Sequence, residues 1–237
     1  MELRQVYSRE QFNPRLVGLF INPLYFARRG LYRAIKSLGK YISGKTLDVG
    51  CGKKPYKNLF RSSKYIGMDI ENPGHGHGDE DIDVYYDGGK FPFKDSEFDS
   101  VVASQVLEHV FEPDDFVKEV KRVLKKNCFL LLTVPFVWDE HEKPNDYGRY
   151  TSFGLRHLLE KNGFKIVKFE KSVCGIRAIV QLINGIIVKK VNFGNKMMSI
   201  AFSILLTFPL NVLGLLFSEN KKSDIYLDNI VLAKNEI

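Results

Sequence analysis

The sequence predicts an α/β protein with a doubly wound, mostly parallel β-sheet. Three observations indicate this fold class. Short apolar runs alternate with helical patterns over residues 46–169, the first run ends in a turn with two glycines, and the second ends in an aspartate. Strands that alternate with helices form βαβ units, and the strands of such units are parallel. Ligands of these sheets bind at the carboxyl ends of the strands, so functional residues are expected there.

The first element expected along the chain is an amphipathic helix over Pro23–Lys40. Leu24, Leu31 and Ile35 recur near helical spacing, with basic residues between them. Short apolar runs then predict six strands: Thr46–Val49, Lys64–Ile70, Asp83–Tyr86, Phe98–Ser104, Phe129–Val134 and Lys165–Phe169.

Two helices and a last strand complete the expected domain. Asp114–Lys126 places its apolar residues on one face, and Pro113 suits a first helical turn. Thr151–Asn162 begins with a capping residue and stops at Gly163, which suits the position after a helix. Ile225–Ala233 is the seventh strand.

An apolar region separates the sixth and seventh strands. Cys174–Val188 is mostly apolar, and Met197–Phe217 has 21 residues without a charge. About 20 apolar residues can cross a bilayer. A single crossing cannot return the chain to the sheet it left, and Pro209 and Asn211 interrupt the run.

We therefore expect a helical insertion over residues 173–223, with a turn at Gly194–Asn195. It leaves the sheet at the carboxyl end of the sixth strand. Two alternatives stay open: a lid that buries its apolar face on the domain, or a hairpin lying in a membrane surface. The expected domains are a basic helical cap (1–44), a ligand-binding domain (45–172 with 224–237) and this insertion.

The charge of the chain is concentrated at its N-terminus. The net charge is +7, and residues 1–45 hold nine Lys and Arg against Glu2 and Glu10, so the rest is balanced. This pattern predicts either contact with one anionic surface, such as a membrane, or a solvated helix face. It argues against a nucleic-acid partner.

The cysteines and the N-terminus indicate the compartment. Three scattered cysteines do not form a disulfide framework or a zinc spacing, and no apolar run follows the start of the chain. We expect a cytoplasmic protein, peripheral on the inner face of the membrane if the insertion lies in lipid.

The turn in LDVGCGKKPY predicts an adenosine-type ligand. Gly50 and Gly52 allow a ligand to approach the backbone closely before a helix start. Asp69 ends the second strand 19 residues after Gly50, where a carboxylate can bind both ribose hydroxyls. The turn that binds a nicotinamide cofactor has a third small residue, which allows the helix to pack closely on the strand. Residues 53–55 (Lys-Lys-Pro) contain no such residue. S-adenosylmethionine has no pyrophosphate and is favoured.

Four motifs in order carry a resemblance to a known family. They are LDVGCG, YIGMDI, FPFKDSEFDSVVASQVLEHV and LKKNCFLLLTVP. Together they resemble class I S-adenosylmethionine-dependent methyltransferases of type 11 over roughly residues 45–170. More narrowly, the GCGKKPY turn and PFVWDEHEKPNDYGRYT resemble a bacterial subgroup associated with surface-polysaccharide biosynthesis. The resemblance implies a Rossmann-like seven-stranded sheet with an antiparallel last strand.

The resemblance also implies which residues bind the cofactor. Asp69 matches the ribose-binding acid and Asp87 the acid on the adenine side. The full set is Asp48, Gly50, Cys51, Gly52, Asp69, Asp87, Ser104 and Gln105. The third loop glycine of the family is absent here, and Asn127 replaces a glycine before the fifth strand.

The segment after the fifth strand is the expected acceptor site. Methyl transfer to a hydroxyl needs a proton removed and the reactants aligned. His141 can be that base or position the acceptor. Asp146 can orient His141 or hold a sugar hydroxyl, and Arg149 can hold a phosphate or carboxylate. The alternative is a loop held together by its own polar groups.

No metal is expected. Glu108–His109 resembles the Glu-His pair of ubiquinone-pathway O-methyltransferases, where a divalent metal can bind, but Gln105 stands where those enzymes have another carboxylate. A hydrogen-bonded structural pair is favoured. His75 and His77, beside acidic residues, are more typical of a loop than of a metal site.

The sequence thus predicts a methyltransferase that O-methylates a sugar or a lipid-linked glycan precursor. A lipid or quinone-type acceptor is the alternative within the same class. Two alternatives remain outside this class. One is a non-catalytic methyltransferase fold that serves as a membrane-associated partner, and the other is a nicotinamide-dependent dehydrogenase, which Pro55 disfavours.

Overall fold

The computed structural model describes residues 9–71, 81–191 and 194–236. His75 and His77 lie outside these residues. The chain divides into two compact units, one of residues 34–170 and 228–237 and the other of residues 1–33 and 171–227. The helices of the N-terminal segment and of the insertion therefore fall mainly within one unit.

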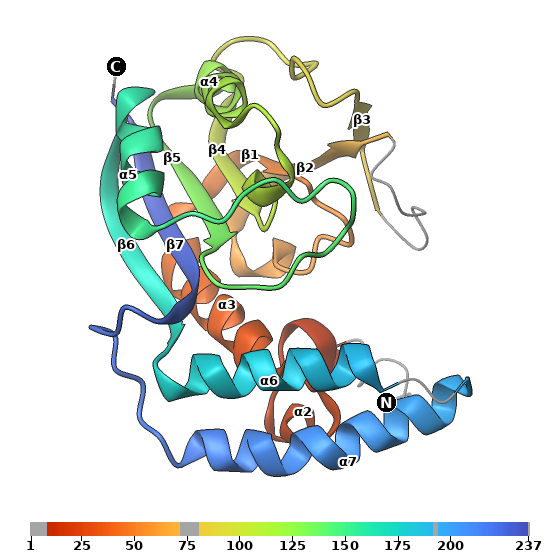
Figure 1. The fold of residues 1–237 in the computed structure, drawn as a ribbon. Helices are drawn as coiled ribbons and strands as arrows, with labels where there is room; N and C mark the ends of the chain where they lie inside the picture. Colours follow the sequence, from red (N-terminus) through yellow and green to blue (C-terminus); the bar gives the residue numbers. More distant parts are fainter. Residues whose placement is uncertain (1–8, 72–80, 192–193, 237) are drawn as a thin grey trace. The chain divides into compact units, whose positions relative to one another are not determined.

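A seven-stranded sheet in the order β3-β2-β1-β4-β5-β7-β6 confirms the predicted fold class (Figure 1). The pairs from β3 to β5 are parallel, and β7 runs antiparallel to β5. The strands are β1 Ser43–Val49, β2 Arg61–Ile70, β3 Val84–Tyr86, β4 Phe98–Ser104, β5 Leu124–Pro135, β6 Phe164–Cys174 and β7 Tyr226–Asn235.

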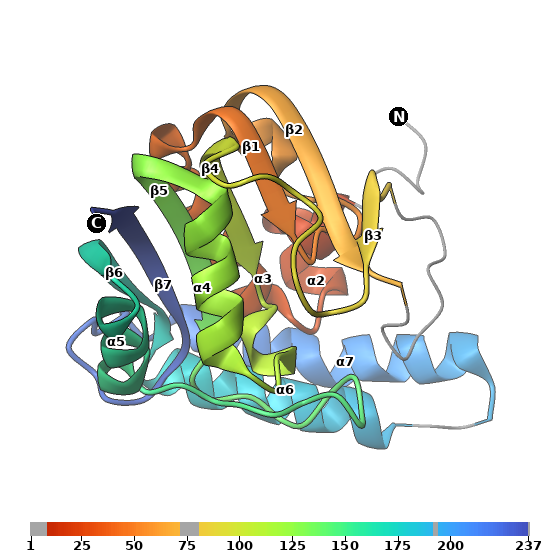
Figure 2. The same ribbon diagram turned by 90° about the horizontal axis from the view of Figure 1, so that it is seen from above.

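Helices α4 (Pro113–Val123) and α5 (Ser152–Lys161) belong to the sheet unit, and Figure 2 shows α4 along one face of the sheet. Phe116, Val120 and Val123 of α4 are buried in one cluster with Leu155 of α5 and apolar residues of the strands. The predicted helix over residues 114–126 extends three residues beyond the end of α4. Leu124 is already extended, and it pairs with Phe98 of β4 instead of continuing the helix.

The loop between β1 and β2 differs from the expected helix start. The described residues there contain a single 3-10 turn, η2 (Lys57–Leu59), and no α-helix. Pro55 and the short distance in sequence from Val49 to Arg61 leave little room for a helix. Two other 3-10 turns are η1 (Gly39–Tyr41) and η3 (Leu107–His109).

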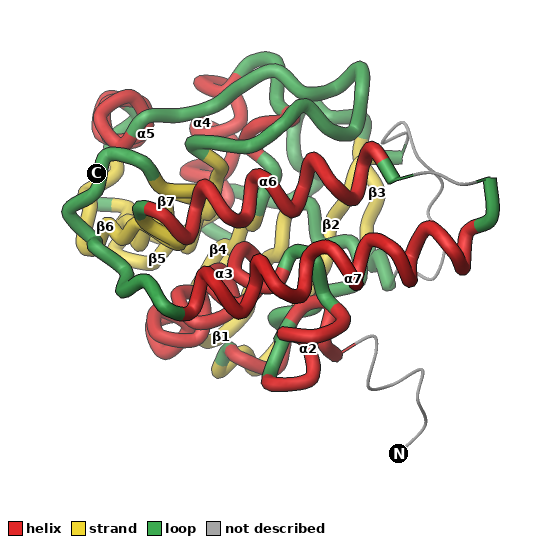
Figure 3. Tube along the Cα trace, turned by 60° about the horizontal axis from the view of Figure 1, so that its bottom comes forward, coloured by secondary structure: helices red, strands yellow, loops and turns green. Residues whose placement is uncertain are grey.

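The other unit is helical (Figure 3). It contains α2 (Leu16–Ile21), the first part of α3 (Tyr25–Leu38), α6 (Ile176–Lys190) and α7 (Lys196–Leu215). The turn predicted at Gly194–Asn195 is confirmed, because Asn195 caps α7 by accepting hydrogen bonds from Met197 N and Met198 N. The helix runs through Pro209.

Three buried amide side chains hold this helical unit together. Gln181 of α6 accepts hydrogen bonds from the backbone of Phe26 and Ala27 and donates one to Pro23 O. Asn184 of α6 donates to Asn211 of α7 at 2.9 Å. Within the described ranges, no helix combines the length and the apolar content needed to cross a bilayer.

Candidate active site

The glycine turn after β1 contains one packed glycine and one open glycine. Gly50 has φ +66°, and a Cβ there would overlap the Val106 side chain. Gly52 has φ +43°, and no heavy atom beyond its chain neighbours lies within 4 Å of the place its Cβ would take. Gly50 therefore has to be glycine because of the fold, whereas Gly52 leaves an open space beside the backbone.

Asp69 at the end of β2 joins this turn. Its Oδ2 accepts a hydrogen bond from Gly52 N at 2.9 Å, and its Oδ1 accepts one from Ile70 N at 2.9 Å. The ribose-binding acid of the prediction thus lies next to the open glycine. An open backbone turn beside a carboxylate fits the adenosine part of S-adenosylmethionine.

Asp48 and Cys51 lie behind the turn and are buried. Burial raises the pKa of Asp48 to about 7, although Tyr65 OH donates a hydrogen bond to Asp48 Oδ2 at 2.6 Å and opposes this shift. Burial also raises the pKa of the Cys51 thiol, and the carboxylate of Asp48 adds to the effect. The Cys51 side chain lies against Gly67 of β2, beneath the turn.

The remaining residues predicted to bind the cofactor lie at the end of β4 or directly after β3 and β4. Asp87 is exposed, and its Oδ1 accepts a hydrogen bond from Gly89 N at 2.9 Å. The hydroxyl oxygens of Ser104 and Thr133 are 3.0 Å apart. Gln105 Nε2 donates a hydrogen bond to the same Thr133 oxygen at 3.2 Å. Gln105 has φ +59°, so the chain turns sharply where β4 ends.

The loop after β5 is fixed by Arg149 and Asp146. Arg149 donates two hydrogen bonds to the Asp146 carboxylate, at 2.6 Å and 2.7 Å, and others to backbone oxygens of the loop. Burial raises the pKa of Asp146, but the hydrogen bonds from Arg149 and from His141 N outweigh it and lower the pKa to about 2. The guanidinium group of Arg149 thus makes these hydrogen bonds within the loop.

His141 is oriented by this pair. Its backbone N donates to Asp146 Oδ2 at 2.9 Å, and its ring Nδ1 lies 3.1 Å from Asp139 O. Among the residues that the structure describes, none makes a hydrogen bond with its Nε2. His141 and Asp146 therefore come together as predicted.

The Glu108–His109 pair lies against the same loop. Tyr147 N and Gly148 N donate to Glu108 O at 2.8 Å and 3.1 Å, and the His109 and His141 rings are 4.8 Å apart. Because β4 and β5 are parallel neighbours, η3 after β4 and the loop after β5 meet at one edge of the sheet. Gly50 packs on Val106, so the glycine turn reaches this edge too.

The comparisons with known proteins agree with this site. Residues 47–132 match the family described as "Methyltransferase domain". This segment contains the glycine turn, Asp69, Asp87, Gln105 and the Glu108–His109 pair. The chain is a class I S-adenosylmethionine-dependent methyltransferase. Its cofactor is S-adenosylmethionine, which excludes the nicotinamide alternative.

Relatives of the methyltransferase are distant. A protein of Methanocaldococcus jannaschii is 29% identical over 203 residues, which are 80% of this chain and 86% of that protein. A S-adenosylmethionine-dependent methyltransferase of Thermotoga maritima has a similar fold, with a TM-score of 0.56, 15% identity, and coverage of 99% of this chain and 96% of that one.

A third similar structure contains the cofactor. It is phosphoethanolamine N-methyltransferase 2 of Haemonchus contortus in complex with S-adenosyl-L-methionine, with a TM-score of 0.56 and 16% identity. The match covers 100% of this chain and 60% of that one. At these identities the two structures share the fold of the methyltransferase, and its acceptor has to be argued from its own residues.

Lys54 of the methyltransferase was not singled out by the sequence pattern. Its ammonium group is buried and pairs with Asp83 at 2.8 Å and Asp81 at 3.3 Å. Burial alone would lower the pKa of Lys54, but the hydrogen bonds to Asp83 and Asp81 outweigh it and raise the pKa. A Cβ on Gly67 would overlap the Lys54 side chain. Lys54 thus fixes the glycine turn to the segment before β3.

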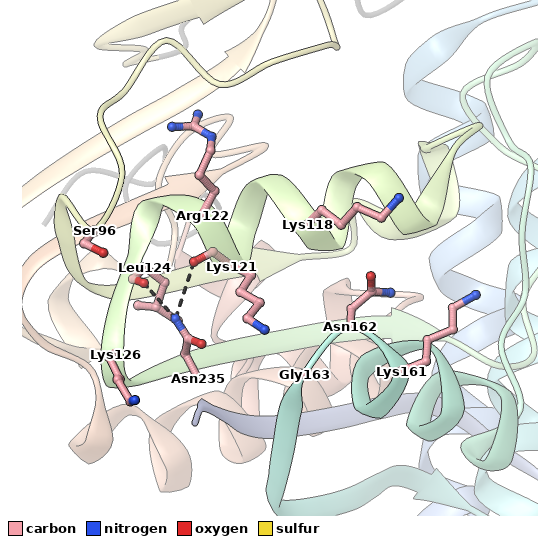
Figure 4. A pocket seen from close by; sticks show the side chains of 10 residues that line it. All are labelled: Ser96, Lys118, Lys121, Arg122, Leu124, Lys126, Lys161, Asn162, Gly163 and Asn235. Carbon is pink, nitrogen blue, oxygen red and sulfur yellow. Dashed lines mark hydrogen bonds between the residues drawn. The ribbon is translucent and has the colours of Figure 1, made fainter. Parts of the chain in front are cut away.

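A basic hollow of the methyltransferase lies at the opposite edge of the sheet, where β4 and β5 begin (Figure 4). Lys118, Lys121, Lys126 and Lys161 line it, and Asn235 hydrogen-bonds to backbone oxygens of residues 121 and 124 beside it. It contains none of the predicted site residues, so it is separate from the candidate active site.

Proposed function

We propose that the methyltransferase transfers its methyl group to a hydroxyl of a sugar or of a lipid-linked glycan precursor. The observation that carries this proposal is the orientation of His141. Asp146 and the Asp139 carbonyl hold its Nδ1 side, which leaves Nε2 for an acceptor. An imidazole that is oriented in this way can accept a hydroxyl proton or hold the hydroxyl in place.

Gly52 and Asp69 serve the cofactor, and His141 serves the acceptor. When bound, S-adenosylmethionine supplies an electrophilic methyl group, whose bond to sulfur breaks with its electron pair staying on the sulfur. Gly52 gives the backbone room for the cofactor, and Asp69 binds the ribose hydroxyls. His141 Nε2 accepts the proton of the attacking hydroxyl or positions that hydroxyl for an in-line attack.

Two exposed aromatic side chains support an acceptor with apolar faces and hydroxyls. Phe111 is 72% exposed and Tyr147 is 49% exposed, and their rings contact each other edge to face at 5.3 Å. Tyr147 lies in the same loop as His141. Such rings can cover one face of a sugar, and they would equally suit the quinone-type alternative.

The test of this function is methyl transfer by a His141→Ala variant. We expect turnover to fall by roughly 10²–10⁴ with unchanged cofactor binding, because a positioned base contributes about that factor. The matched control is His157→Ala, which removes an exposed histidine of α5. Labelled cofactor offered with glycan, lipid and amine fractions identifies the acceptor class. Unchanged turnover in His141→Ala, or methylation of amines alone, contradicts the proposal.

We also propose that the helical unit contacts an anionic lipid surface. Both of its long helices expose large apolar side chains, and α6 ends in exposed Lys189 and Lys190. Large exposed apolar patches are rare on proteins that do not use them. The exposed apolar residues are Ile176, Ile179, Ile183, Ile186, Val188, Met197, Met198, Phe202, Leu205, Leu206, Val212, Leu213, Leu215 and Leu216.

Flotation with vesicles tests this contact. We expect the protein to float with anionic vesicles and less with neutral ones, because basic residues near a membrane each add about 1 kcal/mol. Lys189→Glu with Lys190→Glu should reduce flotation, and Lys118→Glu with Lys126→Glu in the sheet unit is the control. If the protein floats with none of the vesicles and is monomeric without detergent, the result supports the alternative that residues 173–223 form a lid on the domain.

A further inference from the structure

Glu108, His109 and His141 form a cluster whose role as a set the proposed function leaves open. Each offers one potential ligand atom, and these atoms all lie within 4.8 Å of one another. The three residues come from two segments, η3 and the loop after β5, that converge at the carboxyl edge of the sheet. We propose that this cluster binds a divalent metal ion of the Zn²⁺ type.

Glu108 is the observation that points to a ligand. Its side chain is fully buried, and neither carboxylate oxygen has a hydrogen-bond partner among the described residues. Buried polar groups in native proteins are nearly always hydrogen-bonded, and buried charges are paired or coordinate metals. An ion between Glu108 and the two imidazoles would satisfy both of its oxygens.

His109 is held in the tautomer that a metal ligand needs. Its Nδ1 lies 2.7 Å from Asn145 O. A carbonyl oxygen can only accept, so Nδ1 carries the hydrogen and Nε2 carries the lone pair. This Nε2 lies 3.9 Å from Glu108 Oε1 and 3.6 Å from Glu142 Oε2.

The Nδ1 of His141 faces two acceptors and one donor. Its Nδ1 lies 3.1 Å from Asp139 O and 3.4 Å from Asp146 Oδ2. Arg149 Nη2 is also 3.3 Å from this nitrogen, but it donates to Asp139 O and Asp146 Oδ2 at 2.8 Å and 2.7 Å. In metal sites the second ring nitrogen of a ligating histidine usually donates to a carboxylate or a backbone carbonyl.

The charges around the cluster favour a cation. Asp146 is already paired with Arg149. Asp228 lies close enough to Glu108 for their two carboxyl groups to interact. Glu142 adds a further carboxylate, with its side chain 45% exposed. Glu108, Glu142 and Asp228 thus place three carboxyl groups at or beside the cluster.

The ligand types select the kind of ion. Two imidazoles and one carboxylate are the protein ligands of catalytic zinc sites, which keep a further position open. Ca²⁺ and Mg²⁺ prefer oxygen ligands throughout, so two histidines argue against them. The half-exposed Glu142 or an acceptor oxygen can take the open position.

Metal binding can be measured without cofactor or acceptor. We would treat the full chain with a chelator and titrate it with Co²⁺, whose visible absorption reports its ligands, and then displace Co²⁺ with Zn²⁺. We expect one Co²⁺ per chain. Glu108→Gln, His109→Gln and His141→Gln should each weaken binding at least about tenfold, and Asp146→Asn, which acts through His141, by roughly 10–100-fold.

Two controls separate this site from adventitious binding. His157→Gln removes an exposed histidine of α5, and the double variant His75→Gln with His77→Gln removes the other histidines that the sequence offers as ligands. Both should keep the wild-type affinity. Binding of S-adenosylmethionine by each variant shows that the sheet unit is folded.

The outcomes decide the proposal. No Co²⁺ bound by the wild type in excess metal overturns it, as does binding that only the His75 and His77 variant removes. If the cluster variants do not fold, pulsed electron paramagnetic resonance of the Cu²⁺-loaded wild type must show two coordinated imidazoles, and their absence overturns it as well.

Metal binding is independent of the acceptor, whereas a role of the ion in holding the acceptor oxygen rests on the proposed function. In that role His141 would act through the ion, which would hold the acceptor oxygen and lower the pKa of its hydroxyl, so that the proton leaves to water. The two failures are distinguishable. Lack of cluster-dependent Co²⁺ binding overturns the metal site alone, and Co²⁺ binding without methylation of any hydroxyl overturns the proposed function alone.

Discussion

Replacing Gly50 and Gly52 by alanine should have opposite consequences, although only one residue separates them. Both have positive φ, so each alanine costs about 1–2 kcal/mol of backbone strain. Gly50→Ala also drives a Cβ into the Val106 side chain, and such overpacking adds about 1–3 kcal/mol. We therefore expect Gly50→Ala to lose about 2–5 kcal/mol of stability.

Gly52→Ala should lose only the strain of about 1–2 kcal/mol, because its Cβ enters open space. If that space receives the cofactor, the added methyl group clashes with the ligand. An overlap of about 1–3 kcal/mol weakens S-adenosylmethionine binding roughly 5- to 150-fold. Gly50→Ala thus tests the fold, and Gly52→Ala tests the binding site.

Denaturant unfolding gives the stability of both variants, and calorimetry gives their affinity for S-adenosylmethionine. Gly50→Ala combined with Val106→Ala should regain the overpacking part but keep the backbone strain. Wild-type affinity in Gly52→Ala would refute the assignment of the open turn to the cofactor. A stability loss in Gly52→Ala equal to that in Gly50→Ala would refute the packing argument.

Two further predictions concern carboxylates of the same turn. Asp69→Ala should weaken S-adenosylmethionine binding by about 1.5–3 kcal/mol in calorimetry, the value of a hydrogen bond to a charged group, and binding of NADH instead would contradict the cofactor site. Asp48 has a pKa of about 7 in the folded chain against an ordinary 3.8. The folded state therefore retains a proton that the unfolded state releases. The stability of the wild type relative to Asp48→Asn should be greatest below about pH 4 and fall by on the order of 4 kcal/mol as the pH rises through about 7. A constant difference between the two unfolding curves over this range would show that Asp48 is solvated.

The sheet could be predicted because its signals are local. Each strand is a short apolar run, and the order of strands and helices fixes a doubly wound topology. The end of α4 could not be predicted, because Leu124 suits a helix as well as a strand. Leu124 is extended because it pairs with Phe98 of β4, and this contact is not visible in the sequence around Leu124.

The candidate site was predictable only in part. The glycines and Asp69 follow a spacing that strand geometry explains. The convergence of His141 with Glu108 depends on the path of a loop, which two hydrogen bonds to Glu108 O fix. Lys54 carried no signal, because a lysine after a glycine turn is usually solvated, and its burial follows from Asp83 lying beside it.

The paired amides of the helical unit restrict how its helices can slide. Asn211 Nδ2 donates to Leu19 O at 3.0 Å and Asn22 O at 3.2 Å, while its Oδ1 accepts from Asn184. Apolar helix surfaces alone tolerate many registers, whereas a shift of one turn would bury these amides without partners at about 1–3 kcal/mol each. Asn184 and Asn211 therefore fix one alignment of α6 with α7, which the apolar surfaces of the two helices alone would leave open.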